Sequence, residues 1–234
     1  MQLFFQENIN PPLVTLDPEE SKHLTRVLRK KQGDNISLTN GKGMLFECII
    51  LEANPAKTVL KVLKTTEVEE EDFYIHLAIA PTKSPDRMEW MVEKITEIGF
   101  HELTLIESMN SERSFLKTDR LEKKIISASK QSLKYRIPSL NPTQSIQSIL
   151  KSSKFEGFQK FIAYVDENHQ HHLVDLATAK GKYLILVGPE GDFDPSEIKS
   201  AFGAGFKPVS LGKSRLRTET AGLAAVEMLQ IVNR

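Results

Sequence analysis

The apolar positions of the chain follow two different patterns, which change near residue 70. Up to residue 68, short apolar segments suited to strands are separated by turn signals rich in Gly, Asn, Asp and Pro. The expected strands are residues 2–5, 35–38, 44–51 and 57–63. One helix is expected to begin at Pro18, with Asp17 as its N-cap, and to end at about Lys31. A small β-barrel with a basic helix or loop is the natural prediction for this region.

The second region, residues 73–234, alternates between apolar strands and amphipathic helices. The expected strands are residues 73–80, 103–106, 160–165, 183–187 and 208–211. The expected helices are residues 85–98, 119–134, 142–151, 195–202 and 218–232. Strands that are apolar throughout and alternate with helices are typical of a parallel sheet covered on both faces. The predicted fold class is therefore α/β.

The composition is that of an ordinary globular protein, with 40% hydrophobic and 26% charged residues. It excludes a mainly disordered chain and a fibrous repeat. The single cysteine, Cys48, excludes a disulfide framework and a Cys-rich zinc site, and is expected to be inert core. No apolar run approaches the roughly 20 residues of a membrane helix, and the first residues do not form a signal peptide pattern. We therefore expect a cytoplasmic protein without a membrane partner.

The charge is balanced overall, with 31 basic and 31 acidic residues, but it is unevenly distributed. Residues 22–32 hold five cations and no acid, whereas residues 67–72 hold five acids and read as a solvated hinge. Arg26, Arg29 and Lys30 are therefore candidates for phosphate contacts, although a solvated helix face is the plainer interpretation of such a run.

Four polar loops follow four of the predicted strands. Two of them are Gly188-Pro189-Glu190-Gly191 and the basic segment from Gly212 to Arg217. The others are residues 81–87, which contain Lys83 and lead to Trp90, and residues 107–114. Because ligands bind outside the carboxyl ends of parallel strands, these loops are expected to converge on one edge of the sheet. Each loop taken alone is compatible with an ordinary turn.

A histidine cluster, His169, His171 and His172, raises the question of a metal site. Its spacing within a loop has little specificity for a metal, so the prediction is a solvated loop and no metal.

Four segments of the sequence together resemble one family. They are VEKITEIGF at 92–100, SERS at 111–114, LVGPEGDF at 186–193 and VSLGKSRLRTETA at 209–221. They are similar to the RsmE family, the 16S ribosomal RNA uridine N3-methyltransferases of the SPOUT superfamily. Family members commonly have Gly-Gly after GPE, where this chain has Gly191-Asp192. The resemblance covers essentially the whole chain.

The resemblance implies a PUA-like RNA-binding barrel in residues 1–68 and a methyltransferase domain in residues 73–234. The second domain is expected to contain a deep trefoil knot, an exception to the rule that chains do not thread. The implied cofactor is S-adenosylmethionine, and the implied active form is a homodimer. The implied substrate is 16S ribosomal RNA within the small ribosomal subunit.

The site residues that the resemblance implies fall into three groups. The cofactor-binding residues are Leu186, Gly188, Pro189, Glu190, Gly191, Ser210, Leu211, Gly212, Leu216 and Ala221. The leucines among them would form an apolar seat for the adenine. The RNA-binding residues are Arg26, Arg29, Lys30, Lys83 and Arg113, and the catalytic residues are Arg217, Arg215 and Glu219.

Uridine N3 carries a proton, so the reaction needs an anion stabiliser and a proton acceptor. The two arginines suit the first task, and Glu219 or Glu190 suits the second if burial raises its pKa. Two other functions stay open from the sequence: a SPOUT-type methyltransferase for another RNA, and an RNA-binding module without catalysis.

Overall fold

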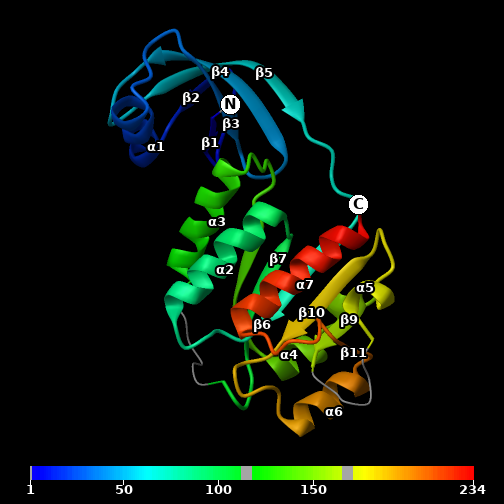
Figure 1. Ribbon diagram of the computed structural model, residues 1–234. Coiled ribbons are helices and arrows are strands. Elements are labelled where there is room, and N and C mark those ends of the chain that lie inside the picture. Colours follow the sequence, from blue (N-terminus) through cyan, green and yellow to red (C-terminus); the bar gives the residue numbers. More distant parts are fainter. Residues whose placement is uncertain (1, 112–117, 165–170) are drawn as a thin grey trace. The chain divides into compact units, whose positions relative to one another are not determined.

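The computed structural model describes residues 2–111, 118–164 and 171–234. The chain divides into two compact units (Figure 1). The first comprises residues up to Glu70 together with Ile126–Ile137, and the second comprises Glu71–Ile125 and Pro138–Arg234. The segment Ile126–Ile137 thus groups with the N-terminal strands, whereas the sequence pattern placed it in the second region.

The first unit is built on a curled five-stranded sheet (Figure 1). Its strands are β1 (Leu3–Phe5), β2 (Leu13–Thr15), β3 (Asn35–Thr39), β4 (Met44–Glu52) and β5 (Val59–Glu67), in the order β1-β3-β4-β5-β2. β1 pairs with β3 in parallel, and the other pairs are antiparallel. Its core includes Phe4, Leu24 and Leu38 together with Cys48, the cysteine expected to be inert. Burial raises the pKa of the Cys48 thiol to about 11.

The helix of this unit begins as predicted and ends early. Asp17 caps helix α1 (Pro18–Lys22) by accepting a 2.8 Å hydrogen bond from Glu20 N. A π-helical turn, His23–Val27, follows directly. Arg29 then has a φ of 55°, a left-handed conformation that a helix cannot contain. The predicted end at Lys31 was therefore wrong by about one turn.

Residues 126–137 belong to the first unit through specific contacts. Lys130, near the end of helix α3 (Asp119–Gln131), forms an ion pair with Glu20. The main chain of Tyr135 accepts hydrogen bonds from Thr39 Oγ1 and from Gly43 N, both at 2.9 Å. Burial raises the pKa of Glu20, and Lys130 opposes this effect only in part. Paired in this way, the buried carboxylate and ammonium avoid much of the cost of burial as single charges.

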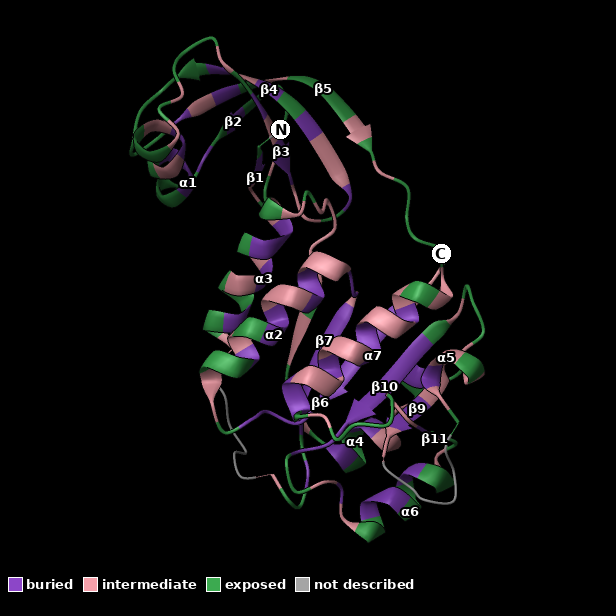
Figure 2. Ribbon diagram, in the orientation of Figure 1, coloured by how far each residue is buried: buried purple, intermediate pink, exposed green. Residues whose placement is uncertain are grey.

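The second unit contains a six-stranded sheet that is parallel throughout. Its strands are β6 (Tyr74–Ile79), β7 (Glu102–Glu107), β8 (Ser139–Ser145), β9 (Gln159–Ala163), β10 (Lys182–Val187) and β11 (Lys207–Val209). The order is β11-β9-β10-β6-β7-β8, which places the most apolar strands, β6 and β10, at the centre. These central strands are almost entirely buried (Figure 2). The α/β prediction is confirmed.

Helices cover both faces of this sheet. The helices besides α3 are α2 (Pro85–Ile98), α4 (Ile146–Leu150), α5 (Leu173–Leu176), α6 (Pro195–Gly203) and α7 (Thr218–Val232). Helices α4 and α6 pack on the face that includes Ala78 and Leu184. Helices α2 and α7 pack together, and a Cβ at Gly222 of α7 would lie 2.8 Å from both Ile79 and Met91. Close approach of α7 to the sheet therefore requires glycine at this position.

One predicted helix was wrong over half its length. Residues 142–151 were expected to be helical, but β8 occupies Ser139–Ser145 and only Ile146–Leu150 are helical. β8 is an edge strand, where Pro142 is tolerated because one side of the strand needs no ladder partner. Ser145 caps α4 by accepting a hydrogen bond from Ser148 N.

A buried polar cluster lies at the amino-terminal ends of β6 and β7. Glu102 accepts a 2.8 Å hydrogen bond from Tyr74 Oη and also contacts Asn141 and Lys154. His76 Nε2 lies 2.7 Å from Thr104 Oγ1, and its Nδ1 lies 3.3 Å from Glu102 Oε2. Burial lowers the pKa of His76 to about 4, against the opposing effect of Glu102. The imidazole is therefore neutral near pH 7.

Within the described residues, no helix combines the length and apolar character needed to cross a membrane. The trefoil knot stays a prediction, because strand order and register do not specify threading.

Candidate active site

The four polar loops meet at the carboxyl edge of the parallel sheet. The loop after β6 joins the loop after β10 through a 3.2 Å hydrogen bond from Lys83 N to Glu190 Oε1. The loop after β7 joins the same turn through Asn110 Nδ2, which donates to Asp192 O at 3.1 Å. Thr218 Oγ1 donates to Gly188 O at 3.1 Å and ties in the start of α7. Hydrogen bonds thus hold this edge together across residues distant in sequence.

The turn after β10 is shaped by close packing and by a left-handed residue. Gly188 is buried, and a Cβ there would lie 3.1 Å from the ring of Phe193. Asp192 has a φ of 62°, and its Oδ1 accepts a 2.7 Å hydrogen bond from Phe193 N. Asp is among the few residues besides Gly that adopt this conformation readily, helped by such local hydrogen bonds. Asp192 therefore occupies a backbone region that glycine also adopts readily.

Glu197 of α6 anchors the loop after β7. Its carboxylate accepts hydrogen bonds from Ser108 Oγ at 2.9 Å and from Met109 N at 3.0 Å. The same side chain completes a capping box with Asp194, as the Asp-Pro-Ser-Glu pattern predicts. One buried carboxylate thus positions both the beginning of a helix and a loop of the site.

The loop after β11 exposes its main chain at Gly212. This residue has a φ of 124°, and nothing lies within 4 Å of where its Cβ would be. Ser210 Oγ accepts a 3.1 Å hydrogen bond from Gly212 N, and Ser210 O accepts one from Leu173 N. The loop is held at its base and open at its tip, a form in which a backbone is able to approach a ligand closely.

Helix α7 has the bounds expected from the sequence, Thr218–Val232. Arg217 is the N-cap residue and makes no side-chain capping bond, and Thr218 is the first helical residue. Its hydroxyl bonds Gly188 O instead of a main-chain amide of the helix. Glu219 follows in the first turn, where the helix dipole favours an anion.

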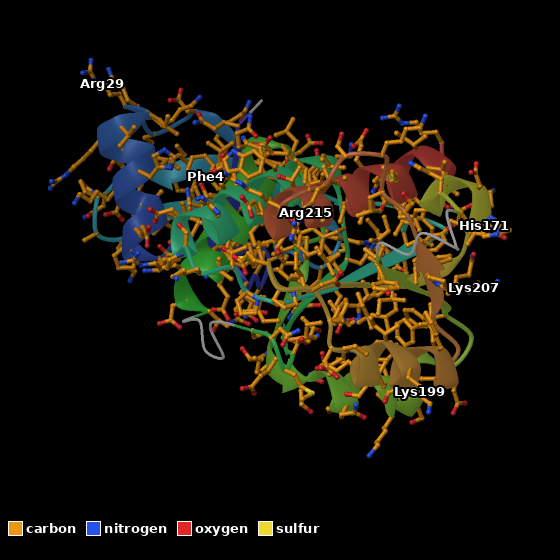
Figure 3. All side chains as sticks on the ribbon, turned by 60° about the horizontal axis from the view of Figure 1, so that its bottom comes forward. Phe4, Arg29, His171, Lys199, Lys207 and Arg215 are labelled. Carbon is orange, nitrogen blue, oxygen red and sulfur yellow. The ribbon has the colours of Figure 1, made fainter. Side chains whose placement is uncertain are left out.

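A cavity of about 630 Å³ opens beside the start of α7. Its walls come from the beginning of α2 and from the segment around Arg215, which Figure 3 shows next to the start of α7. The lining residues are Asp86, Arg87, Trp90, Arg215, Leu216, Arg217, Glu219 and Thr220. All three residues predicted to be catalytic therefore lie around one cavity.

The electrostatics of the cavity are mixed. Arg215 and Arg217 are exposed, whereas Glu219 is only 6% exposed. Arg87 Nε lies 3.7 Å from Glu219 Oε1, and Glu219 Oε2 has no hydrogen-bond partner among the described residues. A buried carboxylate oxygen without a protein partner is unusual in a folded protein.

The predicted cofactor residues are differently placed. Leu186 is fully buried in the core shared with α4 and α6, so its side chain is not part of an apolar seat and that prediction was wrong. Gly188 and Pro189 are also buried, whereas Gly191 and Gly212 are exposed. Half-buried residues complete the set: Ser210, Leu211, Leu216 and Ala221. Glu190 is exposed and bonds Lys83 N, outside the cavity that holds Glu219.

The candidate RNA contacts of the first unit are accessible. Arg26 and Arg29 are exposed and Lys30 is half-buried, and Figure 3 shows Arg29 pointing into solvent. In the part of the chain that the structure describes, these three cations form no ion pair. Lys83 is exposed, and Arg113 lies outside the described residues.

No group of metal-ligating side chains occurs within residues 2–111, 118–164 and 171–234. His169 lies outside this part of the chain. His172 precedes α5 and pairs with Ser210 through the main chain.

The sequence pattern brought residues 81–87 and the following Trp90 to this edge, but it gave Asp86, Arg87 and Trp90 no role in the site. Asp86, Arg87 and Trp90 line the cavity because α2 and α7 pack together, a long-range arrangement without a local pattern. The available signal was a lone tryptophan directly after a polar loop at a strand end.

Comparison with known proteins decides the family. A model of the RNA methyltransferase domain matches residues 69–230, and a model of the RNA methyltransferase PUA domain matches residues 16–63. This chain belongs to the RNA methyltransferase family. The family resemblance read from the sequence is thereby confirmed.

Individual members of the RNA methyltransferase family are similar over almost their whole length. Ribosomal RNA small subunit methyltransferase E of Bacillus subtilis is 26% identical, over 98% of this chain and 94% of its own. The crystal structure of a probable rRNA-methyltransferase from Porphyromonas gingivalis matches with a TM-score of 0.93 and 42% identity, covering 100% and 98% of the two chains. Ribosomal RNA small subunit methyltransferase E from Neisseria gonorrhoeae, bound to S-adenosyl methionine, matches with a TM-score of 0.89 and 28% identity over 100% and 98%.

Proposed function

We propose that this protein transfers a methyl group from S-adenosylmethionine to N3 of a uridine in 16S ribosomal RNA of the small subunit. The observation that carries the proposal is the cavity in which Arg215, Arg217 and Glu219 meet, beside two glycine-containing loops at the carboxyl edge of a parallel sheet. Relatives at similar length that are named ribosomal RNA small subunit methyltransferase E support the choice of substrate.

The loops at this edge fit the cofactor. Gly191 and Gly212 are exposed, and the space around Gly212 is open, so the backbone of these loops is able to approach a ligand closely. Leu211 and Leu216 are half-buried and supply apolar surface for an adenine. S-adenosylmethionine brings a methyl group that its sulfonium charge has already activated, so the chain's own residues have the tasks of binding, orientation and proton removal.

The cavity residues suit the chemistry of the acceptor. Arg215 and Arg217 offer guanidinium donors to the uracil carbonyls, whose oxygens gain negative charge once N3 loses its proton. Glu219 is the better proton acceptor of the two candidates because it shares the cavity with these arginines, whereas Glu190 is occupied with Lys83 N outside it. We therefore propose Glu219 as the general base.

The proposed RNA partner is supported by the basic residues of the first unit. Arg26, Arg29 and Lys30 present accessible cations for RNA phosphates, and the unit that carries them matches the PUA domain model. We further propose that the active form is a homodimer, that the substrate is presented within the small ribosomal subunit, and that the protein works in the cytoplasm, where that subunit is assembled.

The test is a methylation assay with S-adenosylmethionine and small ribosomal subunits from a strain deleted for the gene of this protein. Mass spectrometry of the digested RNA should find one N3-methylated uridine in 16S RNA that is missing without the enzyme. A methyl group on another base, on a ribose or on another RNA would overturn the proposed substrate. Absence of any transfer by the folded protein would overturn the proposed activity.

A further inference from the structure

Trp90 is the chain's single tryptophan, and it occupies the accessible side of α2. Its side chain is 46% exposed, whereas Met88, Met91 and Val92 of the same helix are fully buried. Packing of α2 therefore rests on other residues. The indole instead forms part of the wall of the cavity that contains Glu219. A large aromatic ring facing an open cavity is the type of surface on which nucleobases stack.

The rest of the cavity offers hydrogen bonds of both kinds. Arg215 and Arg217 provide donors, and Glu219 Oε2 is an acceptor without a partner among the described residues. Arg87 lies on the other oxygen of the same carboxylate, with its Nε 3.7 Å from Oε1. Arg87 thus lies beside one oxygen of Glu219, whereas the other oxygen is buried and has no partner among the described residues.

We propose that this cavity is the seat of the extruded target base, with Trp90 as its stacking platform and Glu219 Oε2 as the acceptor that reads its N–H group. The inference rests on the proposed function and adds the base-binding residue. The Watson–Crick edge of uracil presents two carbonyl oxygens on either side of one N–H, which requires the donors and the acceptor found here. Cytosine presents an unprotonated N3, which would place a lone pair against the carboxylate, so the cavity rejects it.

The size of the cavity is consistent with this occupant. A volume of about 630 Å³ lies within the range of about 300–1,000 Å³ typical of small-molecule sites, and it accommodates a base with part of its ribose. Uridine paired in a helix hides its N3, so the enzyme has to extrude the nucleotide before it reacts. A stacking partner in the cavity replaces some of the stacking energy that is lost on extrusion.

The kinetic test compares Trp90→Phe, which keeps an aromatic face, with Trp90→Leu, which removes it. Methylation of small ribosomal subunits should show a KM for RNA raised roughly 10-fold or more in Trp90→Leu, with a smaller change of kcat, and a KM near that of the natural enzyme in Trp90→Phe. Phe202→Leu on α6 is the matched control, because Phe202 is a 42% exposed aromatic residue outside the cavity. Its KM should not change.

The spectroscopic test uses the natural protein, excited at a wavelength that tyrosine does not absorb, so that the fluorescence reports Trp90 alone. A uridine hexanucleotide should quench this fluorescence, whereas a hexamer of abasic ribose phosphate should not. Quenching by S-adenosylhomocysteine and not by the uridine hexamer would assign the cavity to the cofactor and overturn the proposal. A change with protein concentration alone, without RNA, would assign the cavity to a second copy of the chain and overturn it as well.

The kinetic and the spectroscopic test together distinguish failure of this inference from failure of the proposed function. Methylation of 16S RNA with an unchanged KM in Trp90→Leu and no quenching by the uridine hexamer would refute the base seat and leave the function standing. Quenching by the uridine hexamer in a protein that methylates no ribosomal RNA would support the base seat and refute the function.

Discussion

Thr218 Oγ1 donates a 3.1 Å hydrogen bond to the carbonyl oxygen of Gly188, joining the first residue of α7 to the end of β10. The two residues lie in the two glycine-containing segments that are proposed to hold the cofactor. Thr218 is only 5% exposed, so water does not easily replace the bond. The bond therefore couples the position of one cofactor loop to that of the other.

Replacement of Thr218 by Val should separate these loops with little change in volume. The variant loses the donor to a buried carbonyl, which costs about 1–3 kcal/mol of unfolding free energy, and its affinity for S-adenosylhomocysteine should fall. Urea denaturation and calorimetry measure the two effects. Thr218→Ser keeps the hydroxyl and should retain most of the affinity. Equal cofactor affinity in Thr218→Val and the natural protein would show that the bond does not organise the loops.

Replacement of Arg217 and replacement of Arg26 should impair different steps, turnover in the first case and RNA binding in the second. Arg217→Ala removes a donor from the proposed transition state, so turnover at saturating RNA should fall by roughly 10²–10³. Arg26→Ala should weaken RNA binding, lower its salt dependence by about one unit of slope and leave that turnover largely intact.

The control for both arginine variants is Lys199→Ala, an exposed cation on α6 that points away from the helix (Figure 3). It should match the natural enzyme in steady-state kinetics and filter binding. If Arg217→Ala keeps full turnover and loses only affinity, Arg217 positions the substrate and another group stabilises the charge.

Replacement of Gly222 by a larger residue should destabilise the protein. A Cβ at this position would lie 2.8 Å from Ile79 Cδ1 and from Met91 Sδ, both in a fully buried core. Gly222→Val should therefore lower the free energy of unfolding by about 1–3 kcal/mol. Gly203→Val, at the end of α6 with nothing within 4 Å, should change it by less than about 0.5 kcal/mol. Equal stability of the two variants in chemical denaturation would contradict the close packing.

His76 should make the stability of the protein depend on pH. Its pKa is lowered by burial from 6.5 to about 4. Between these pH values the imidazole is protonated in the unfolded chain and neutral in the folded chain. Stability is therefore complete above pH 6.5 and is lost as the pH falls towards 4, by about 2 kcal/mol between pH 7 and pH 5. Chemical denaturation at the two pH values measures this change.

The variant His76→Gln removes the titrating group from the same position. Its stability should fall less between pH 7 and pH 5 than that of the natural protein. Glu102 does not obscure this comparison in the natural protein: burial would raise its pKa, but His76 and hydrogen bonds from Lys154, Asn141 and Tyr74 hold it below its usual value of 4.5. An identical loss in both proteins would exclude His76 as the source.

The sequence predicted the elements whose local signals agree with their place in the sheet. β10 is a continuous apolar run, and the Asp194-Pro195 start of α6 has a complete capping box. The helix at 142–151 failed because pairing with β7 holds Ser139–Ser145 in a strand, against the local signal of Pro142. β2 was missed because three residues, only one of them buried, leave no pattern to detect.

In the candidate site, too, some positions could be predicted from local sequence and others depend on long-range packing. The carboxyl-edge rule placed Gly188, Gly212 and the loops around them correctly at one edge, because parallel strands end on the same side. It also brought residues 81–87 and Trp90 to this edge. It did not predict that Arg87 and Trp90 line one cavity with Glu219, since the packing of α2 on α7 depends on contacts such as Gly222 against Met91. Leu186 was misassigned because an apolar residue at the end of a strand has the same sequence pattern whether its side chain faces the core or the ligand.

The order of strands in the parallel sheet has a consequence for how the protein reaches its native state. β6 is among the first strands of its unit to be synthesised, yet one of its two neighbours is β10, near the other end of the chain. Until Lys182–Val187 has left the ribosome, the main-chain edge of the apolar strand β6 has no permanent partner on that side. Non-local pairing of this kind slows folding and prolongs the exposure of a strand edge. A protein that acts on ribosomal RNA is thus itself a product whose central strand becomes complete only late in translation.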